Sequence, residues 1–117
     1  MEVLLDSNFL LTCIKQKIDF FEDTKLMGIR IIIPKQILNE LKILEQRSNS
    51  NARIALKLLK EEDFREIDLQ DSKTDRAIIK FAKKNPSVII ATLDKEIQDK
   101  TKNKKLIIRG KKKLEII

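Results

Sequence analysis

The sequence lacks the parts of several catalytic classes. It contains no histidine, tryptophan or tyrosine, a single cysteine, two glycines and two prolines. Ser/His/Asp and Cys/His catalysis need an imidazole base, and zinc sites draw mainly on histidine and cysteine, so both chemistries are excluded. Gly28 and Gly110 lie far apart, which excludes a glycine-rich phosphate loop or a dinucleotide fingerprint. The scarcity of aromatic residues also argues against a stacking platform for single-stranded nucleic acid.

The single cysteine and the first apolar run bear on cellular location. Cys13 has no partner for an internal disulfide, and its neighbours are mostly apolar, so we expect a core residue in a reducing cytoplasm. Asp6 interrupts the N-terminal apolar run, which is neither a signal sequence nor a membrane span. We expect a soluble cytoplasmic protein with no membrane partner. A length of 117 residues with 42% apolar residues predicts one domain over 1–117.

Positive charge is concentrated near the C-terminal end. Lysine and arginine number 25 against 18 acids, a net charge of +7. Residues 95–113 contain nine bases and only two acids, Glu96 and Asp99. This segment alone accounts for the net charge of +7, so the rest of the chain is close to neutral. Such a segment is typical of a polyanion-binding protein that contacts mainly phosphates, and its alternative is a solvated lysine-rich face. The nine bases are Lys95, Lys100, Lys102, Lys104, Lys105, Arg109, Lys111, Lys112 and Lys113.

Short β-branched runs alternate with helical patterns along the chain. Several runs are continuously apolar, which is typical of strands buried on both faces of a parallel sheet. We therefore predict an α/β fold, a three-layer α/β/α arrangement with a mainly parallel sheet of about five strands. The expected strands are Val3–Leu5, Ile29–Ile33, Phe64–Leu69, Val88–Leu93 and Leu106–Arg109, and the expected helices are Asn8–Leu26, Pro34–Gln46, Asn51–Lys60 and Thr74–Lys83.

Two aspartates follow predicted strands at the edge where ligands bind in such sheets. Asp6 ends the first strand and Asp94 ends the fourth. Both also precede helices, so each is equally well interpreted as an N-cap, a role worth about 1 kcal/mol. The two roles are compatible, and the pair is more informative than either residue alone.

Two further acids lie on predicted helices. Asp75 precedes Ile78, Ile79 and Ala82 at helical spacing, which places it on the apolar face, although a first-turn acid also suits the helix dipole. Glu40 flanks the apolar stripe of its helix and alone resembles a surface glutamate. Four acids converging on one sheet edge repel one another unless a cation is present, and oxygen ligands favour Mg²⁺ or Mn²⁺.

An acidic crevice beside a basic segment points to a metal-dependent nuclease. Two divalent ions about 4 Å apart can activate water and stabilise the leaving oxygen of a phosphodiester. The basic segment, in particular Lys95, Arg109 and Lys111–Lys113, is then expected to bind the polyanion, which in a cytoplasm is most commonly nucleic acid.

Four stretches, in this order and spacing, resemble the PIN-domain ribonucleases over nearly the whole chain. The closing stretch is similar to the branch that includes archaeal VapC-like proteins and nucleases of small-subunit ribosomal RNA processing. The four stretches are Leu4–Leu11 (LLDSNFLL), Pro34–Leu41 (PKQILNEL), Asp75 opening a helix, and Ala91–Glu96 (ATLDKE), and the closing stretch is Ile107–Glu115 (IIRGKKKLE).

The resemblance implies an endoribonuclease that uses one or two Mg²⁺ or Mn²⁺ ions and leaves 5′-phosphate and 3′-hydroxyl ends. It assigns the metal site and the catalytic residues to Asp6, Glu40, Asp75 and Asp94, assisted by Asn8 and Thr92. Ser7 replaces a more usual threonine, and Lys73-Thr74 stand where another acid is frequent. With one acid fewer, the site has less negative charge to hold a second ion tightly. Asp71 and Asp99 are candidates to replace the missing acid.

Alternatives remain open at this point. A non-catalytic RNA-binding or ribosome-assembly module with a PIN-like fold keeps the same basic segment. A receiver-type phosphoacceptor is disfavoured, because Asp6 lacks a paired acid and the fifth predicted strand ends at Arg109-Gly110. Toxin, with an antitoxin partner, and rRNA-processing enzyme, with an assembly-factor partner, are not distinguished. Phe20 and Phe21 suit either a core or a homodimer, which the resemblance also implies.

Overall fold

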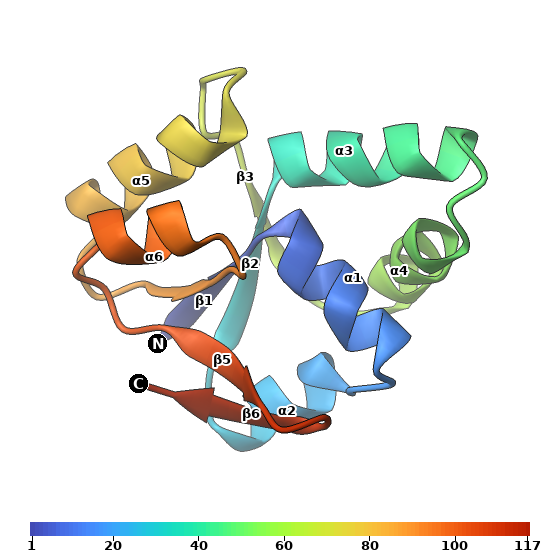
Figure 1. Ribbon diagram of the computed structural model, residues 1–117, viewed down its shortest axis with the longest axis horizontal. Helices are drawn as coiled ribbons and strands as arrows, with labels where there is room; N and C mark the ends of the chain where they lie inside the picture. Colours follow the sequence, from blue (N-terminus) through green and yellow to red (C-terminus); the bar gives the residue numbers. More distant parts are fainter.

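The computed structural model describes residues 1–117 as a parallel sheet between two helical layers (Figure 1). Four strands form the sheet in the order β3-β2-β1-β4, and all three pairings are parallel. The elements are β1 (Glu2–Leu5), α1 (Ser7–Lys15), α2 (Phe20–Leu26), β2 (Arg30–Pro34), α3 (Lys35–Gln46), α4 (Ser50–Glu61), β3 (Arg65–Ile67), α5 (Thr74–Lys84), β4 (Ile89–Ala91), α6 (Lys95–Lys100), β5 (Leu106–Arg109) and β6 (Lys113–Ile116).

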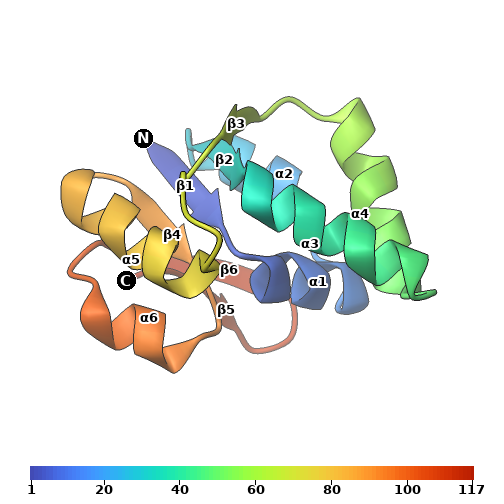
Figure 2. The same cartoon turned by 90° about the horizontal axis from the view of Figure 1, so that it is seen from above.

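Side chains alternate across the sheet and fill two hydrophobic layers. On β1, Val3 and Leu5 face the layer that contains α1 to α4, whereas Leu4 faces α5 and α6. Ile32 of β2 and Ile90 of β4 join Leu4 on that second face. Figure 2 shows α5 and α6 on one side of the sheet and α1, α3 and α4 on the other. The continuously apolar runs are therefore explained, because both faces of each central strand are buried.

The α/β class and the parallel sheet are confirmed, but the sheet has four strands rather than five. Residues 106–109 form β5 as predicted, yet β5 pairs antiparallel with β6 in a separate two-stranded sheet. Only a single parallel bridge, Ile90 to Lys105, links this hairpin to β4. Gly110 turns the chain at a φ of +64°, a conformation that favours glycine, and so directs it into a hairpin.

The predicted helix from Asn8 to Leu26 is wrong as one element, because the chain turns between α1 and α2. Lys17 adopts a left-handed φ of 58°, which no helix interior accommodates. Asp19 then caps α2, since its Oδ1 accepts a hydrogen bond of 3.1 Å from the backbone N–H of Glu22. The remaining predicted helices begin and end within one residue of the observed bounds.

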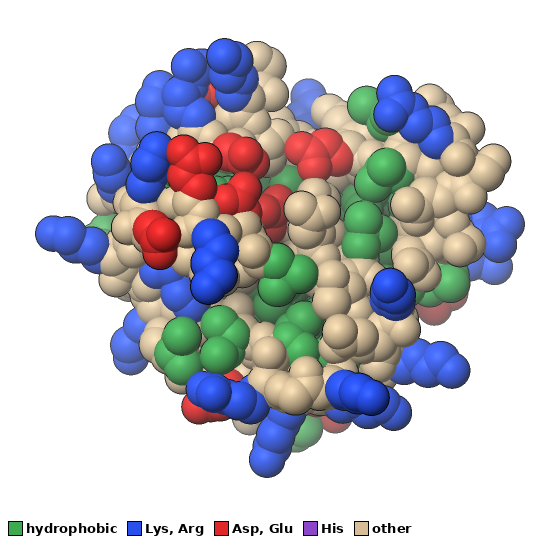
Figure 3. Space-filling model, in the orientation of Figure 1, with side chains coloured by type: hydrophobic (Ala, Val, Ile, Leu, Met, Phe, Trp, Pro, Cys, Tyr) green, Lys and Arg blue, Asp and Glu red, His purple; other side chains and the backbone are tan.

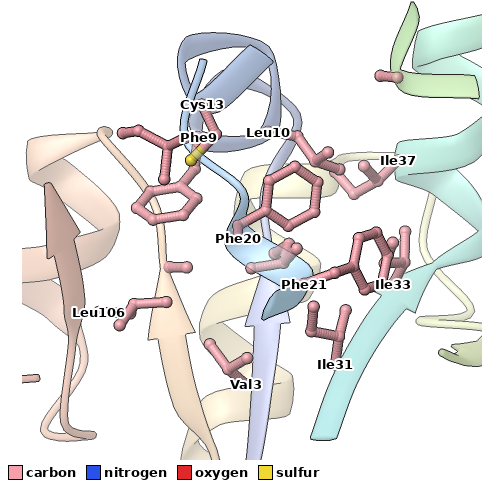
Figure 4. Packing of buried hydrophobic residues seen from close by; sticks show 14 of the residues in the cluster. Val3, Phe9, Leu10, Cys13, Phe20, Phe21, Ile31, Ile33, Ile37 and Leu106 are labelled. Atoms are coloured by element: carbon pink, nitrogen blue, oxygen red, sulfur yellow. The ribbon is translucent and has the colours of Figure 1, made fainter. Parts of the chain in front are cut away.

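The predicted core residue Cys13 is buried, and so are Phe20 and Phe21, which the sequence left open (Figure 4). Cys13 is fully buried, and burial raises the pKa of its thiol to about 12, so the thiol is unreactive. Phe20 and Phe21 are both buried, with ring centroids 4.8 Å apart, which decides for core packing at these two positions. None of the helices has the length and apolar character needed to cross a bilayer.

Candidate active site

The four predicted acids line one pocket at the carboxyl ends of β1 and β4. Asp6 directly follows β1, Asp94 precedes α6, Asp75 lies in the first turn of α5, and Glu40 lies on α3. Parallel strands end at a common edge, which is why residues far apart in sequence meet here. Figure 3 shows acidic side chains gathered in a hollow between these elements. This acidic pocket has a volume of about 340 Å³ and is lined by Asp6, Ser7, Asn8, Glu40, Ile43, Leu44, Asp75 and Asp94.

Asp6 is the buried acid of the pocket, with only 5% of its surface exposed. Its Oδ1 accepts from the backbone N–H of Ser7 at 2.8 Å, and its Oδ2 accepts from the hydroxyl of Thr92 at 2.7 Å. The two hydrogen bonds lower the pKa of Asp6, but burial has the larger effect and raises this pKa above its usual value. The negative charges of Glu40 and Asp75 raise it further. Asp6 is thus both the N-cap of α1 and a buried carboxylate whose charged form is disfavoured by its surroundings.

Glu40 is half-buried, and hydroxyl groups from two other elements fix its carboxylate. The hydroxyl of Ser7 donates to Oε2 at 2.7 Å, and that of Thr74 donates to Oε1 at 2.9 Å. Glu40 therefore bridges the start of α1 to the start of α5, which a surface glutamate would not do. Sequence reasoning noted Ser7 and Thr74 only as departures from a pattern and missed their role in orienting Glu40.

Asp75 lies on the same face of α5 as Ile78 and Ala82, as predicted, but it is exposed and not packed against the sheet. Ala77, Ile78 and Ala82 form the buried face of α5, while its first turn extends beyond the sheet edge and carries Asp75 into the pocket. The pKa of Asp75 is raised, first by partial desolvation and then by the charge of Asp94, with smaller contributions from neighbouring acids. Neighbouring carboxylates therefore raise the pKa values of both Asp75 and Asp6, in addition to the larger effect of desolvation.

Asp94 caps α6 and faces the pocket as well, so the two interpretations of this residue are compatible. Its Oδ1 accepts from the backbone N–H groups of Glu96 and Ile97 at 2.9 and 3.3 Å. Its own backbone N–H donates to the Thr92 hydroxyl at 3.1 Å. Thr92 is buried and links Asp6 to Asp94 through one oxygen, which suits the assisting role predicted for it. Asn8 lines the pocket with an exposed side chain.

The two acids considered as substitutes lie outside the acidic pocket. Asp71 forms a bidentate pair with Arg76, at 2.9 and 3.1 Å, and that hydrogen bonding holds the pKa of Asp71 down at about 2. Asp99 is an exposed residue on α6. Neither residue faces the other four acids.

The donors of the pocket are carboxylate, hydroxyl and amide oxygens, the set that Mg²⁺ and Mn²⁺ prefer. No three carboxylates already stand close enough together to coordinate one ion. Both oxygens of Asp6 and of Glu40 are occupied by hydrogen bonds, and like charges keep the four groups apart. The residue types fit a divalent ion, and side-chain rotation toward it would complete the ligand set.

The predicted basic segment is dispersed in the structure. Lys95 opens α6 beside Asp94 and is exposed, so it stays next to the pocket. Arg109 pairs with Glu115 at 2.7 Å on the β5–β6 hairpin. Lys105 is half-buried and donates to the carbonyls of Thr101 and Asn103, and burial lowers its pKa. Residues 111–113 are exposed around the hairpin turn. The RNA contacts of these bases stay a prediction.

Comparison with known proteins gives the class of this fold and site. A family model described as "PIN like domain" matches residues 3–111. The chain belongs to this family.

Two relatives make the similarity concrete. Ribonuclease VapC4 of Methanocaldococcus jannaschii is 30% identical, over 98% of this chain and 95% of that protein. The solved structure of the PIN domain endonuclease Utp24 superimposes with a TM-score of 0.81 at 24% identity, covering 98% of this chain and 90% of that one. At that identity the second comparison supports the fold, and the PIN-like fold predicted from sequence is confirmed.

Proposed function

We propose that this chain is a divalent-metal-dependent endoribonuclease whose active site is the acidic pocket. The observation that carries the proposal is the convergence of Asp6, Glu40, Asp75 and Asp94 from both helical layers on one pocket. The pKa values of Asp6 and Asp75 are raised in part by neighbouring acids, so the cluster is costly when nothing offsets its charge. A cluster that raises its own free energy in this way is typical of a functional site.

Each acid has a distinct part in holding the ion. Asp6 contributes the most firmly placed carboxylate, because Thr92 and the Ser7 backbone fix both of its oxygens. Asp94 keeps Oδ2 free while Oδ1 caps α6. Asp75 is exposed and would be free to rotate toward an ion, and Glu40 would contribute a carboxylate whose two oxygens are held by hydroxyl groups. When bound, Mg²⁺ or Mn²⁺ supplies Lewis-acid chemistry that lowers the pKa of water and offsets charge on the phosphate.

The remaining residues of the pocket position the acids and the substrate. Ser7 and Thr74 keep Glu40 turned into the pocket, and Thr92 keeps Asp6 and Asp94 in register. Hydrogen bonds of this kind to metal ligands fix their orientation, and their loss typically costs 10- to 100-fold in metal affinity or activity. Asn8 offers an amide at the pocket rim for a phosphate or a water.

The proposed substrate is RNA. A ribonuclease is similar over almost the full length of both chains, which supports this substrate class. Toxin and ribosomal RNA-processing enzyme share this pocket chemistry, and they differ in whether an antitoxin or an assembly factor is the partner. A homodimer is likewise proposed from the family resemblance alone.

Cleavage of a mixed-sequence RNA tests the function directly. Wild type and Asp6→Asn are incubated with Mn²⁺, with Mg²⁺ and with chelator, and Asp99→Asn is the matched control for the loss of one negative charge. We expect cleavage by wild type and by Asp99→Asn with metal only, and none by Asp6→Asn. Salt-sensitive RNA binding without any cleavage would contradict the proposal and favour the non-catalytic RNA-binding module.

A further inference from the structure

A second hollow continues from the acidic pocket along α5 and α6. It has a volume of about 1080 Å³ and shares Glu40 and Asp75 with the acidic pocket. A third hollow, of about 320 Å³, shares Lys83 and Lys100 with the second. The three hollows are therefore adjacent along this face, and we call the part beyond Asp75 the α5–α6 groove.

Basic side chains line the α5–α6 groove from end to end. Figure 3 shows lysine and arginine side chains over α5, next to the acidic cluster. Apart from Thr74 and Ile79, the second hollow is lined by charged residues only, and beyond Asp75 its one acid is Glu96. The bases of the groove are Lys73, Arg76, Lys80, Lys83, Lys100 and Lys102.

We propose that the α5–α6 groove is the track for one strand of RNA leading to the acidic pocket, with its phosphates on these bases. This inference rests on the proposed function, because it names how the substrate of that same pocket is held. An anionic backbone is repelled by four carboxylates, so a contiguous row of cations is needed to bring it there. Base readout is not required for such contacts, which accords with a groove lined by lysine and arginine rather than aromatic rings.

Most of these bases are available to phosphates, the exception being Arg76, which is held in the bidentate pair with Asp71. Lys73 and Lys83 form no ion pair within the protein, and they lie at the two ends of α5. Lys80 lies 4.0 Å from Asp71 with 64% of its side chain exposed, which leaves it accessible. Lys100 pairs with Glu96, and both side chains are more than half exposed, so water screens that pair.

The dimensions of the groove suit a short stretch of one strand. The eleven residues of α5 are about 16 Å long at 1.5 Å per residue. A stacked strand advances about 3.4 Å per nucleotide, so the groove accommodates a few phosphates. The acidic pocket lies at one end of this stretch, which places the cleaved bond at the end of the track rather than in its middle.

The β5–β6 hairpin is the competing basic surface. Figure 1 shows the hairpin turn at the lower edge of the view, whereas the N-terminal ends of α3 and α5 lie near the top. Its Arg109 is paired with Glu115, which leaves residues 111–113 as its free cations. These hairpin lysines lie away from the acidic pocket, whereas the groove bases line a hollow that shares Glu40 and Asp75 with that pocket.

Binding of a fluorescent single-stranded RNA, measured by anisotropy in chelator, separates the two surfaces. The groove variant is Lys73→Gln/Lys83→Gln, and the matched control is Lys111→Gln/Lys112→Gln, which removes the same charge from exposed positions. Each phosphate contact on a single strand contributes about 0.7 to the salt slope. We expect the groove variant to bind on the order of tenfold more weakly at 0.1 M salt, with the slope reduced by about 1.4. The hairpin variant should bind like wild type.

The outcomes distinguish this proposal from the proposed function. An equal loss in both variants, or a larger loss in the hairpin variant, overturns the groove as the RNA track. A groove variant that binds and cleaves like wild type overturns the groove but leaves the nuclease intact. Weaker binding in the groove variant alone, together with a wild type that cleaves no RNA with Mn²⁺, supports the groove and overturns the nuclease. Melting temperatures of the three proteins exclude unfolding as the cause.

Discussion

The two faces of the sheet are covered by hydrophobic layers of unequal size. Twenty buried residues pack on the side of α1 to α4, and seven pack on the side of α5 and α6. Asp6 and Glu40 come from the larger layer, whereas Asp75 and Asp94 come from the smaller one. The acidic pocket therefore lies at the seam where the two layers meet. Because burial of apolar surface dominates folding energetics, we expect the larger layer to contribute more to stability than the smaller one.

The four acids also differ in how firmly their carboxylates are held. Both oxygens of Asp6 and of Glu40 accept hydrogen bonds. Asp75 is exposed, and Asp94 keeps one oxygen free. The larger layer thus provides fixed carboxylates, and the smaller layer provides carboxylates able to adjust. Under the proposed function, an ion bound between them ties the smaller layer to the larger, which stabilises the folded protein.

The largest expected effect is on stability and comes from the larger layer. Phe9 is fully buried there, so Phe9→Ala should lower the free energy of unfolding by about 3–5 kcal/mol. Ile97→Val, in the smaller layer, should cost about 0.5–1.5 kcal/mol. Urea unfolding of both variants measures the difference. A loss from Phe9→Ala no larger than that from Ile97→Val would contradict the close packing of Phe9 in the larger layer.

The next largest effect is on catalysis and comes from the smaller layer. Asp94→Asn should reduce metal-dependent cleavage by more than about 100-fold, because it removes a ligand rather than a group supporting one. Asparagine caps helices as well as aspartate, so α6 and the melting temperature should be retained. Initial rates with Mn²⁺ measure the change, and Asp99→Asn is the control on the same helix. Retained activity of Asp94→Asn would remove this residue from the site.

Thr92→Val should have an intermediate effect, because Thr92 joins the two layers. Its hydroxyl donates to Asp6 and accepts from the backbone of Asp94, so valine leaves two polar groups without their partner. We expect a loss of about 1–3 kcal/mol in the free energy of unfolding and a 10- to 100-fold weaker metal affinity. Thr101→Val is the control, since the hydroxyl of Thr101 donates only to backbone carbonyls of α6. Calorimetric Mn²⁺ titration with an unchanged affinity would contradict this role.

The smallest effect is on the pH dependence of stability without metal. The pKa of Asp6 is raised above 3.8 in the folded state, so its contribution to the free energy of unfolding falls as pH rises through that pKa. The pKa of Asp71 is lowered to about 2, so its contribution is present above about pH 4 and is lost toward pH 2. In chelator, Asp6→Asn should gain stability over wild type as pH rises, and Asp71→Asn should lose it. Urea unfolding across this range that shows parallel curves would contradict both pKa shifts.

The sequence predicted the central architecture because periodicity is a local property. Continuous apolar runs are visible at Ile31–Ile33 and Ile89–Ala91, which form most of the inner strand β2 and the whole of the edge strand β4. The breaks were harder to find. A left-handed residue at Lys17 and a cap at Asp19 divide one apolar pattern into two helices, and the Asp19–Glu22 spacing was the available signal. Gly110 was the corresponding signal for the hairpin.

The four acids were found from sequence, but their environments were not. Strand ends mark Asp6 and Asp94, whereas Glu40 rested on the resemblance, because no local pattern shows that Ser7 and Thr74 turn it inward. Asp75 was placed on the correct face of its helix, but helical spacing does not reveal that the first turn of α5 leaves this residue exposed. The α5–α6 groove was missed because its bases are spread over α5, α6 and the residues beside them, and do not form one run in the sequence.

Location of a divalent ion tests the central claim most directly. Crystals soaked in Mn²⁺ and measured near the manganese absorption edge give an anomalous map that identifies the ion without reference to activity. We expect a peak in the acidic pocket about 2.1 Å from carboxylate oxygens of Asp6 and Asp94, with Asp75 rotated toward it. A map with no peak there, from crystals in which the pocket is open to solvent, would contradict a metal-dependent active site at the seam of the two layers.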